Sequence, residues 1–459
     1  MDFLCLIFVT MVLLTRPSDY ISLPNLYLIV IVSCLLVSLL SGSIARVLSL
    51  VSPRSLRRWP VSACVIGLLG ATVLSDVANM KIDVLLGPGF EFSKVIVFFL
   101  LLVGLVNTQR RLRRLMLATA LFISVTVAIS VLQYHGYVDF EAFYVPWEGG
   151  RIYGGLIEDR MIGPGSYCDP NDVCALINLA MMLSLYGLFT ARPRVLRVPW
   201  LALLVLQGYA LKLTQSRGGL LGAMVGLGVF FWAQFGGRRA ALTLAMSLPV
   251  LLSMFGARQL NLSSQAGTAQ ERIQLWSDAI EHFKRSPIVG VGGECLVTYM
   301  RPPHNTFLTA YCDLGIIGGT LFLGAFFLGF LRLYQLGSRA GARPVRASRR
   351  PARPAFGPGP VPAPIPGGTV DPELEQIHPF LVGAIAGYAL TVASTNQTYM
   401  VVTYEVLGFV AAYIQIAESR PSAGVGRMLF DGRTIGRLCL ASVGFMALLF
   451  FYTQLKVRW

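Results

Sequence analysis

Long apolar stretches recur along almost the whole chain and limit what it can fold into. A helix needs roughly 20 consecutive apolar residues to cross a hydrocarbon core of about 30 Å. Such stretches begin near residues 24, 61, 92, 114, 171, 197, 218, 240, 305, 379, 398 and 437, and a shorter run covers residues 3–15. Since 55% of the residues are apolar and only 13% are charged, we expect an all-α, polytopic membrane protein with about 12–13 transmembrane helices.

The run at residues 3–15 has the length of a secretory signal peptide but lacks its pattern. Asp2 stands where a basic residue is usual, and no small-x-small cleavage site precedes Arg16. We therefore expect a retained helix, and the sequence leaves open whether it spans the membrane.

Arginine and lysine residues gather in alternate connections between the expected helices, which indicates the orientation of the chain. By the positive-inside rule, the connections rich in these residues face the cytoplasm. The net charge of +15 is then mainly a topology signal, and no basic motif with interleaved aromatic residues indicates a nucleic-acid partner. The arginines on that side are Arg46, Arg54, Arg57, Arg58, Arg110, Arg111, Arg113, Arg114, Arg192, Arg194, Arg197, Arg238, Arg239, Arg420, Arg427, Arg433 and Arg437, together with seven in residues 332–377.

Hydropathy and composition divide the chain into four parts. Residues 1–134 are N-terminal transmembrane helices, and residues 135–335 form a central part with outer loops at 135–171 and 257–303. Residues 336–378 are rich in proline, glycine and arginine and too poor in apolar residues to pack, so we expect a disordered cytoplasmic linker. Residues 379–459 return to transmembrane helices.

The second outer loop contains a helical pattern. Ile273, Trp276, Ile280 and Phe283 recur at spacings of three and four residues. This periodicity predicts an amphipathic helix lying against the membrane surface and ending at Ser286-Pro287.

Four polar clusters are expected at the outer face. They are Arg151 with the helix-capping turn Asp169-Pro170-Asn171, Ser216-Arg217, Glu271-Arg272, and His304-Asn305. Guanidinium groups match phosphate oxygens in bidentate geometry, and a histidine can accept a proton near neutral pH. Together they predict a site for a phosphorylated, lipid-anchored substrate, because ionisable groups at a membrane are costly without a function.

Four segments of this region resemble, in order, the signatures of the O-antigen ligase and polymerase superfamily. They cover roughly residues 150–330 and read GRIYGGLIEDRMIGPGSYCDPND, LTQSRGGLLGAMVGL, ERIQLWSDAIEHFKRSPIVGVG and HNTFLTAYCDLGIIGGTLF. In the last of them, nine residues separate His304-Asn305 from Gly315-x-x-Gly318, which resembles the ligase branch in particular.

The resemblance implies a glycosyltransferase of the bacterial inner membrane with the all-helical GT-C architecture. Such enzymes move a glycan from an undecaprenyl-pyrophosphate carrier, on the periplasmic side, to a hydroxyl of an acceptor lipid, glycan or protein. Carried over position by position, it implies that Arg217 and Arg272 hold the pyrophosphate and that His304 assists the acceptor. Further candidates for glycan or phosphate contact are Arg151, Asn171, Arg301 and Asn305.

No metal or cofactor is expected. The outer loops show no acidic cluster with metal-ligand spacing, and the eight cysteines form no C-x-x-C pair. Arginines in place of a divalent ion are then the economical way to neutralise a pyrophosphate.

Two alternatives remain open. A polymerase would use a second lipid-linked repeat as acceptor, and the sequence barely separates it from a ligase. A transporter of lipid-linked sugars would more naturally show related halves with broken helices and arginines at membrane depth.

Overall fold

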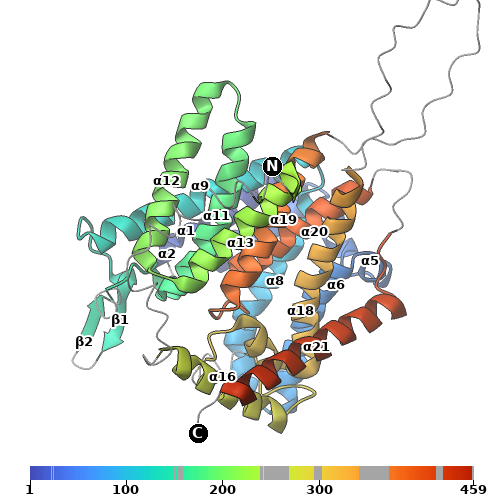
Figure 1. The fold of residues 1–459 in the computed structure, drawn as a ribbon. Coiled ribbons are helices and arrows are strands. Elements are labelled where there is room, and N and C mark those ends of the chain that lie inside the picture. The colour runs from blue at the N-terminus through green and yellow to red at the C-terminus, as the bar shows by residue number, and fades with distance from the viewer. Residues whose placement is uncertain are drawn as a thin grey trace, which may run out of the picture.

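The computed structural model describes residues 1–21, 23, 25–147, 150–153, 159–237, 241, 268–293, 302–340, 372–419 and 427–456. Helices dominate these residues (Figure 1). The chain begins with α1 (Asp2–Thr15), α2 (Pro17–Tyr20), α3 (Leu26–Leu40), α4 (Ile44–Ser49), α5 (Pro53–Arg58), α6 (Pro60–Ala78), α7 (Ile82–Leu86), α8 (Pro88–Leu105) and α9 (Gln109–Tyr134). It continues with α11 (Pro170–Thr190), α12 (Arg197–Thr214), α13 (Arg217–Phe235), α16 (Thr268–Arg285), α18 (Thr306–Ala340), α19 (Pro372–Val392), α20 (Val401–Glu418) and α21 (Gly432–Lys456).

Within the described residues, nine helical spans are long and apolar enough to cross a membrane, and two further apolar helices, α1 and α3, are shorter. The chain is therefore a multi-pass membrane protein, as its composition predicts. The apolar stretch near residue 240 lies almost entirely outside the described residues. Of the linker predicted at 336–378, residues 336–340 continue α18, residues 372–378 begin α19, and residues 341–371 lie outside the described residues. The nine spans are Pro60–Ala78, Ile82–Leu105, Gln109–Tyr134, Pro170–Thr190, Arg194–Thr214, Arg217–Phe235, Thr306–Gly337, Val401–Glu418 and Gly432–Lys456.

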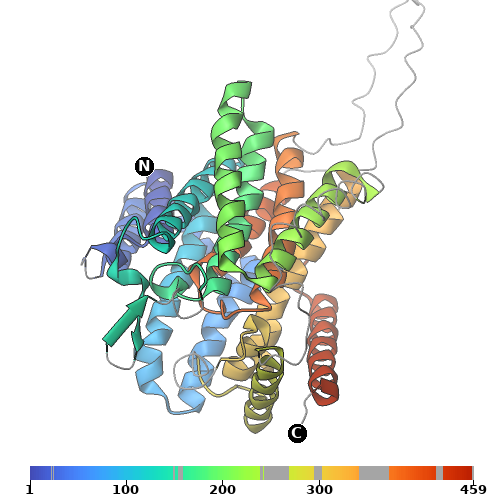
Figure 2. The ribbon, with the colours of Figure 1, turned by 60° about the vertical axis from the view of Figure 1, so that its left-hand side comes forward.

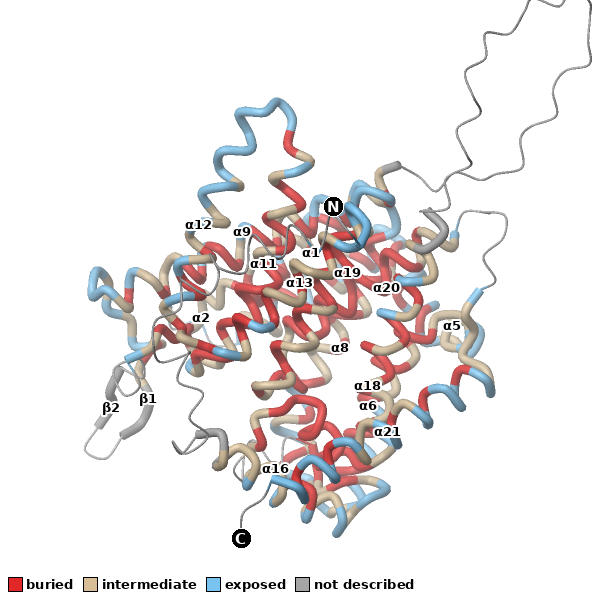
Figure 3. The backbone as a smooth tube through the Cα atoms, viewed as in Figure 1, coloured by how far each residue is buried: buried red, intermediate tan, exposed pale blue. Residues whose placement is uncertain are grey.

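Burial separates central from peripheral helices. α11 and α20 are buried along most of their length, whereas α12 and α21 expose apolar side chains such as Leu201, Val205, Leu440 and Leu448 (Figure 3). Exposed apolar side chains on long helices are stable in contact with lipid tails. The peripheral helices therefore form the lipid-facing surface, and the central ones form the protein core.

Glycines bring α13 and α19 into close contact. A Cβ atom added to Gly222 would lie 2.8 Å from the carbonyl oxygen of Gly387, and one added to Gly383 would lie 2.7 Å from that of Gly226. The glycines are four residues apart on each helix, which is the small-xxx-small pattern of closely packed membrane helices. This packing sets the position of the start of α13, where Arg217 lies.

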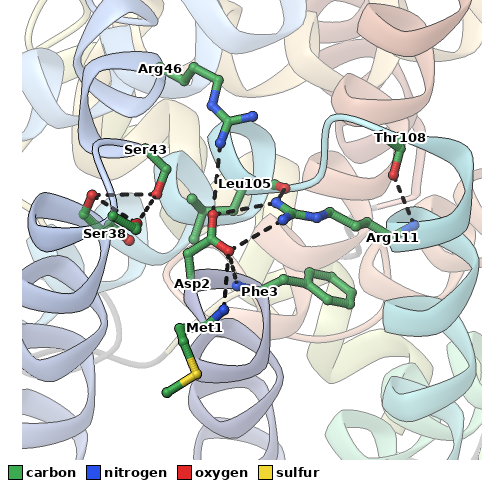
Figure 4. Close-up of polar contacts among 10 residues, drawn as sticks. Met1, Asp2, Phe3, Ser38, Ser43, Arg46, Leu105, Thr108 and Arg111 are labelled. Carbon is green, nitrogen blue, oxygen red and sulfur yellow. Dashed lines mark hydrogen bonds and ion pairs between the residues drawn. The ribbon is translucent and has the colours of Figure 1, made fainter.

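The first helix is anchored at its start by charge. Asp2 lies 3.3 Å from Nη2 of Arg111 and 3.8 Å from Nη2 of Arg46 (Figure 4). Leu6 and Leu14 of α1 are fully buried, and α1 packs against α3, α8 and α9. The expectation of a helix at residues 3–15 is confirmed, and Asp2 brings its start to the end of the bundle where arginines gather.

The two ends of the bundle differ in character. Figures 1 and 2 show the connection between α11 and α12 at one end and α16 with the small sheet at the other. The first end contains exposed Arg192 and Arg194, and we call it the arginine-rich end. The second end is called the site end, because the turn between α12 and α13 lies on its side of the bundle, away from the connection between α11 and α12.

A small two-stranded sheet accompanies the helices. β1 (Tyr144–Trp147) pairs antiparallel with β2 (Gly150–Tyr153), and Tyr144 lies opposite Tyr153. β-branched and aromatic residues favour strands, so Tyr-Val-Pro-Trp and Arg-Ile-Tyr form a hairpin that hydropathy alone does not indicate.

Helix α18 is broken at Gly315, where φ is 64° and ψ is −167°. The segment that follows α16 pairs with the backbone groups freed there. The Ile316 amide donates to the Pro287 carbonyl at 2.8 Å, and the Gly292 amide donates to the Asp313 carbonyl at 3.0 Å. The apolar stretch beginning near residue 305 was expected to form one membrane helix, and the break at Gly315 corrects that expectation. Only glycine readily adopts this backbone conformation.

Candidate functional site

Arg217 is the first residue of α13, and its side chain is exposed at the site end. Ser216 before it caps the helix, since its Oγ accepts a hydrogen bond from the Gly219 amide at 3.0 Å. The same hydroxyl donates to Oδ1 of Asn171 at 2.7 Å. Arg217 is therefore held beside the start of α11.

Asn171 serves as the joint between α11 and α13. Its Nδ2 donates to Oδ1 of Asp169 at 2.8 Å, and Asp169 also accepts from the Asn171 backbone amide at 2.6 Å. The predicted Asp169 cap is thus confirmed. The buried Asn171 amide pairs on both sides and so links the start of α11 to the start of α13.

Arg160 is a cation near Arg217 that the sequence analysis did not select. Its Nε donates to the carbonyl of Thr214 at 2.7 Å, three residues before Arg217. A half-buried guanidinium therefore lies at the turn between α12 and α13. Its position depends on a contact 54 residues apart in the chain, which no local pattern reveals.

His304 and Asn305 stand at the start of α18. Asn305 is the helix cap, since its Oδ1 accepts from the Leu308 amide at 3.2 Å, and it is only 3% exposed. His304 precedes the cap with φ of 48°, in the left-handed region, where histidine is enriched among non-glycine residues. The histidine is half-buried. Because Asn305 caps the helix, the side chain of His304 is not needed for capping.

Helix α16 carries Arg272 and confirms the predicted amphipathic pattern. Ile280 is buried, Trp276 and Phe283 are partly buried, and the other face exposes Gln274, Asp278, Glu281 and Arg285. The apolar face packs against Leu308 and Cys312 of α18 and Leu449 of α21. The helix therefore packs on protein through the face that was expected to contact the membrane.

Trp276 links α16 to the segment of His304. Its Nε1 donates to the carbonyl of Pro303 at 2.8 Å. Arg272 lies four residues before Trp276, and residues at this spacing share one side of a helix. The half-buried Arg272 therefore lies on the side of α16 that faces the start of α18.

A polar loop between α19 and α20, residues 394–398, closes the site. It reads Ser-Thr-Asn-Gln-Thr. Thr395 Oγ1 donates to the carboxylate of Asp172 in α11. Thr306 Oγ1 in α18 donates to the Thr395 carbonyl at 2.7 Å and accepts from the Gln397 amide at 2.9 Å. This loop thus fastens α11 to α18.

The same loop touches the start of α13. A Cβ atom added to Gly218 would lie 1.9 Å from Oγ of Ser394. Residues 394–398 therefore lie between the helix start that carries Arg217 and the one that follows His304. The sequence analysis placed a helix start near residue 398, whereas α20 begins at Val401. Five neutral polar residues in a row between two apolar stretches were the available signal.

For three remaining candidates the structure describes only the backbone or nothing. Arg151 lies in β2, opposite Pro146. The backbone of Glu271 belongs to α16, and Arg301 lies outside the described residues.

Among the described residues, no three or more His, Cys, Asp or Glu side chains gather as metal ligands would. The polar groups brought together at the site end are instead arginines, a histidine and neutral hydrogen-bonding side chains. Such a set can bind anionic oxygens, move a proton and recognise hydroxyl groups.

The segment from α12 to the middle of α18 contains most of these groups, and it can be compared with known families. Residues 201–323 match the O-antigen ligase family. The match contains Arg217, Arg272 and His304, and it confirms the resemblance to the ligase and polymerase superfamily. Asn171 and the 394–398 loop lie outside the matched segment. No curated protein matches the chain significantly.

The O-antigen ligase match indicates a membrane protein that joins glycans. The match implies lipid-linked glycans as substrates. The site end brings together arginines, which can bind phosphate oxygens, and a histidine, which can accept a proton near neutral pH.

Proposed function

We propose that the protein transfers a glycan from undecaprenyl pyrophosphate to an acceptor hydroxyl on the periplasmic face of the bacterial inner membrane. One observation carries this proposal. The 394–398 loop contacts the segments of Arg217 and His304, and Trp276 links the helix of Arg272 to the His304 segment. These contacts lie on the side of the bundle away from the connection between α11 and α12. By the positive-inside rule, that end faces the periplasm.

Arg217 and Arg272 bind the pyrophosphate of the donor. Breaking the bond to the sugar leaves negative charge on undecaprenyl pyrophosphate, and two guanidinium groups stabilise that charge. Arg217 also stands at the start of α13, where the partial positive charge of the helix favours an anion. Removal of one such donor typically raises a barrier by about 2.7–4 kcal/mol.

His304 acts as the general base. The acceptor oxygen attacks the anomeric carbon, and its proton passes to the imidazole of His304. The bond between the anomeric carbon and the phosphate oxygen breaks, and the electron pair leaves with undecaprenyl pyrophosphate. The Asn305 cap and the bond from Trp276 to Pro303 hold the histidine segment in place. No metal ion is needed in this scheme, because the arginines carry the charge.

A ligase and a polymerase differ only in the acceptor. A ligase joins the glycan to lipid A core, another lipid or a protein, whereas a polymerase joins it to a second lipid-linked repeat. The spacing of His304-Asn305 and Gly315-x-x-Gly318 favours the ligase.

The break in α18 is the feature that favours a transporter, since broken helices often form transport sites. Here the segment 287–293 fills the break. A Cβ atom added to Gly290 would lie 2.2 Å from the carbonyl oxygen of Asp313. The freed backbone groups thus pair with protein, which supports a rigid joint instead of a substrate path.

The test is transfer from a synthetic undecaprenyl-pyrophosphate glycan by the purified protein in nanodiscs with EDTA. Lipid A core, a second lipid-linked repeat, or no acceptor is supplied in separate reactions. A single transfer to the core supports the ligase, and a ladder on the carrier supports the polymerase. Lipid translocation without any transfer contradicts both.

A further inference from the structure

The 394–398 loop buries three of its side chains and leaves two half-buried. Thr395, Gln397 and Thr398 are at most 2% exposed, whereas Ser394 and Asn396 are half-buried. The side chains of Thr395 and Thr398 hold the loop by hydrogen bonds to Asp172 and to the Thr306 carbonyl, and the other two residues reach its accessible side. Asn396 is therefore available to a bound molecule. The Ser394 hydroxyl donates to the Thr391 carbonyl at 2.8 Å, and its oxygen remains available as an acceptor.

The loop backbone is firmly fixed. The Gln397 carbonyl accepts from Thr403 Oγ1 at 2.6 Å, and the Thr398 carbonyl accepts from the Tyr404 hydroxyl at 2.8 Å. Thr306 pairs with the backbone of Thr395 and Gln397 on the opposite side. A backbone held from two helices presents Asn396 in one position, and such preorganisation favours specific binding.

Asn396 is oriented by one contact. Its amide pairs through Oδ1 with Thr309 Oγ1 at 3.1 Å, and the other half of the amide points away from that contact. A sugar hydroxyl both donates and accepts hydrogen bonds, so either half of the amide can pair with it. Neutral amide and hydroxyl groups match sugar hydroxyls better than they match phosphate charges, which arginine binds.

The position of the 394–398 loop indicates which sugar residue of the glycan it would contact. Ser394 lies against Gly218, the residue after Arg217. Asn396 pairs with Thr309 in the first turn of α18, a few residues after His304. With pyrophosphate on Arg217 and the acceptor at His304, the sugar whose anomeric carbon reacts lies between them.

We propose that Asn396, with Ser394 beside it, binds the sugar residue attached directly to the pyrophosphate and contributes to selecting the glycan. This inference rests on the proposed function. It names residues outside the O-antigen ligase match, on a loop that brings together α11, α13 and α18.

The test compares two lipids binding to the protein in nanodiscs. One is the undecaprenyl-pyrophosphate glycan, and the other is undecaprenyl pyrophosphate without sugar. Asn396→Ala is expected to weaken binding of the glycan lipid about 3- to 10-fold, the range of one neutral hydrogen bond, and to leave the sugar-free lipid unchanged. Arg217→Ala is expected to weaken both. Asn107→Ala, at an exposed asparagine of the arginine-rich end, is the matched control.

If Asn396→Ala does not fold, binding of the two lipids to Thr309→Val tests the same inference independently. It removes the hydroxyl that orients Asn396 at nearly constant side-chain volume, and a smaller loss for the glycan lipid alone is expected. An equal loss for both lipids, or no loss for either, overturns the inference. If the wild type binds neither lipid better than undecaprenol, the proposed function itself fails.

Discussion

Trp276 donates a hydrogen bond from its indole Nε1 to the carbonyl oxygen of Pro303 over 2.8 Å. This contact joins the amphipathic helix of Arg272 to the residue that precedes His304. The Cys312 thiol adds a second link by donating to the Ala279 carbonyl at 3.0 Å. The cation proposed for pyrophosphate and the proposed base are therefore parts of one packed unit.

Trp276→Phe should slow transfer about 3- to 10-fold, because it deletes one hydrogen bond worth roughly 1 kcal/mol while keeping an aromatic ring. The measurement is kcat with the undecaprenyl-pyrophosphate glycan. Trp232→Phe, on an exposed tryptophan of α13, is the matched control and should be unchanged. Equal rates for the two variants would mean that the Pro303 contact does not position His304.

Ser216→Ala should reduce both stability and transfer. It removes a helix cap, which costs about 1 kcal/mol, and it also removes the partner of Asn171 next to Arg217. Ser52→Ala removes the corresponding cap of α5, where Ser52 accepts from the Ser55 amide at 3.3 Å. Melting temperatures should fall for both variants, but transfer should fall only for Ser216→Ala. Loss of activity in both would indicate a general effect of helix capping.

Arg217→Ala should lower kcat about 10²- to 10³-fold, the usual effect of losing one stabilising donor for developing charge. Arg217→Lys should recover only part of this rate, since an ammonium group lacks the bidentate fork of arginine. Arg194→Ala, at an exposed arginine of the opposite end, is the control. Full activity of Arg217→Ala at normal protein levels would exclude a role in binding pyrophosphate.

Gly222→Ala should destabilise the bundle by about 1–3 kcal/mol through overpacking, because its Cβ would lie 2.8 Å from the Gly387 carbonyl oxygen. The matched control is Gly70→Ala in α6, where an added Cβ atom would have no heavy atom within 4 Å. This substitution should be neutral or stabilising, since alanine favours helices by about 0.5–1 kcal/mol over glycine. Thermal unfolding in detergent measures both, and similar melting temperatures would argue against a tight contact of α13 with α19.

Local patterns predicted part of this molecule well. The apolar stretches predicted the long helices, and the spacing of Ile273, Trp276, Ile280 and Phe283 predicted α16, because amphipathic periodicity is a property of adjacent residues. The cap at Asp169 followed from its position before Pro170.

The features missed from the sequence depend on contacts between distant segments. The break at Gly315 is stabilised by hydrogen bonds with Pro287 and Gly292. A glycine in an apolar stretch does not indicate which distant residues will pair with the backbone there. The 394–398 loop is positioned by hydrogen bonds of Thr395 with Asp172 and Thr306, which are 223 and 89 residues away from it in the chain. Such pairings arise only when the helices pack.

The most direct test of the account is a single-turnover transfer rate with His304→Ala, measured against His135→Ala as a control for loss of an imidazole outside the site. The undecaprenyl-pyrophosphate glycan is bound at saturation, and acceptor is added to start the reaction. If His304 is the general base, the transfer rate of His304→Ala falls about 10²- to 10⁴-fold, the usual contribution of such a group, while donor binding is retained and His135→Ala stays near the wild-type rate. A wild-type rate for correctly folded His304→Ala would contradict it.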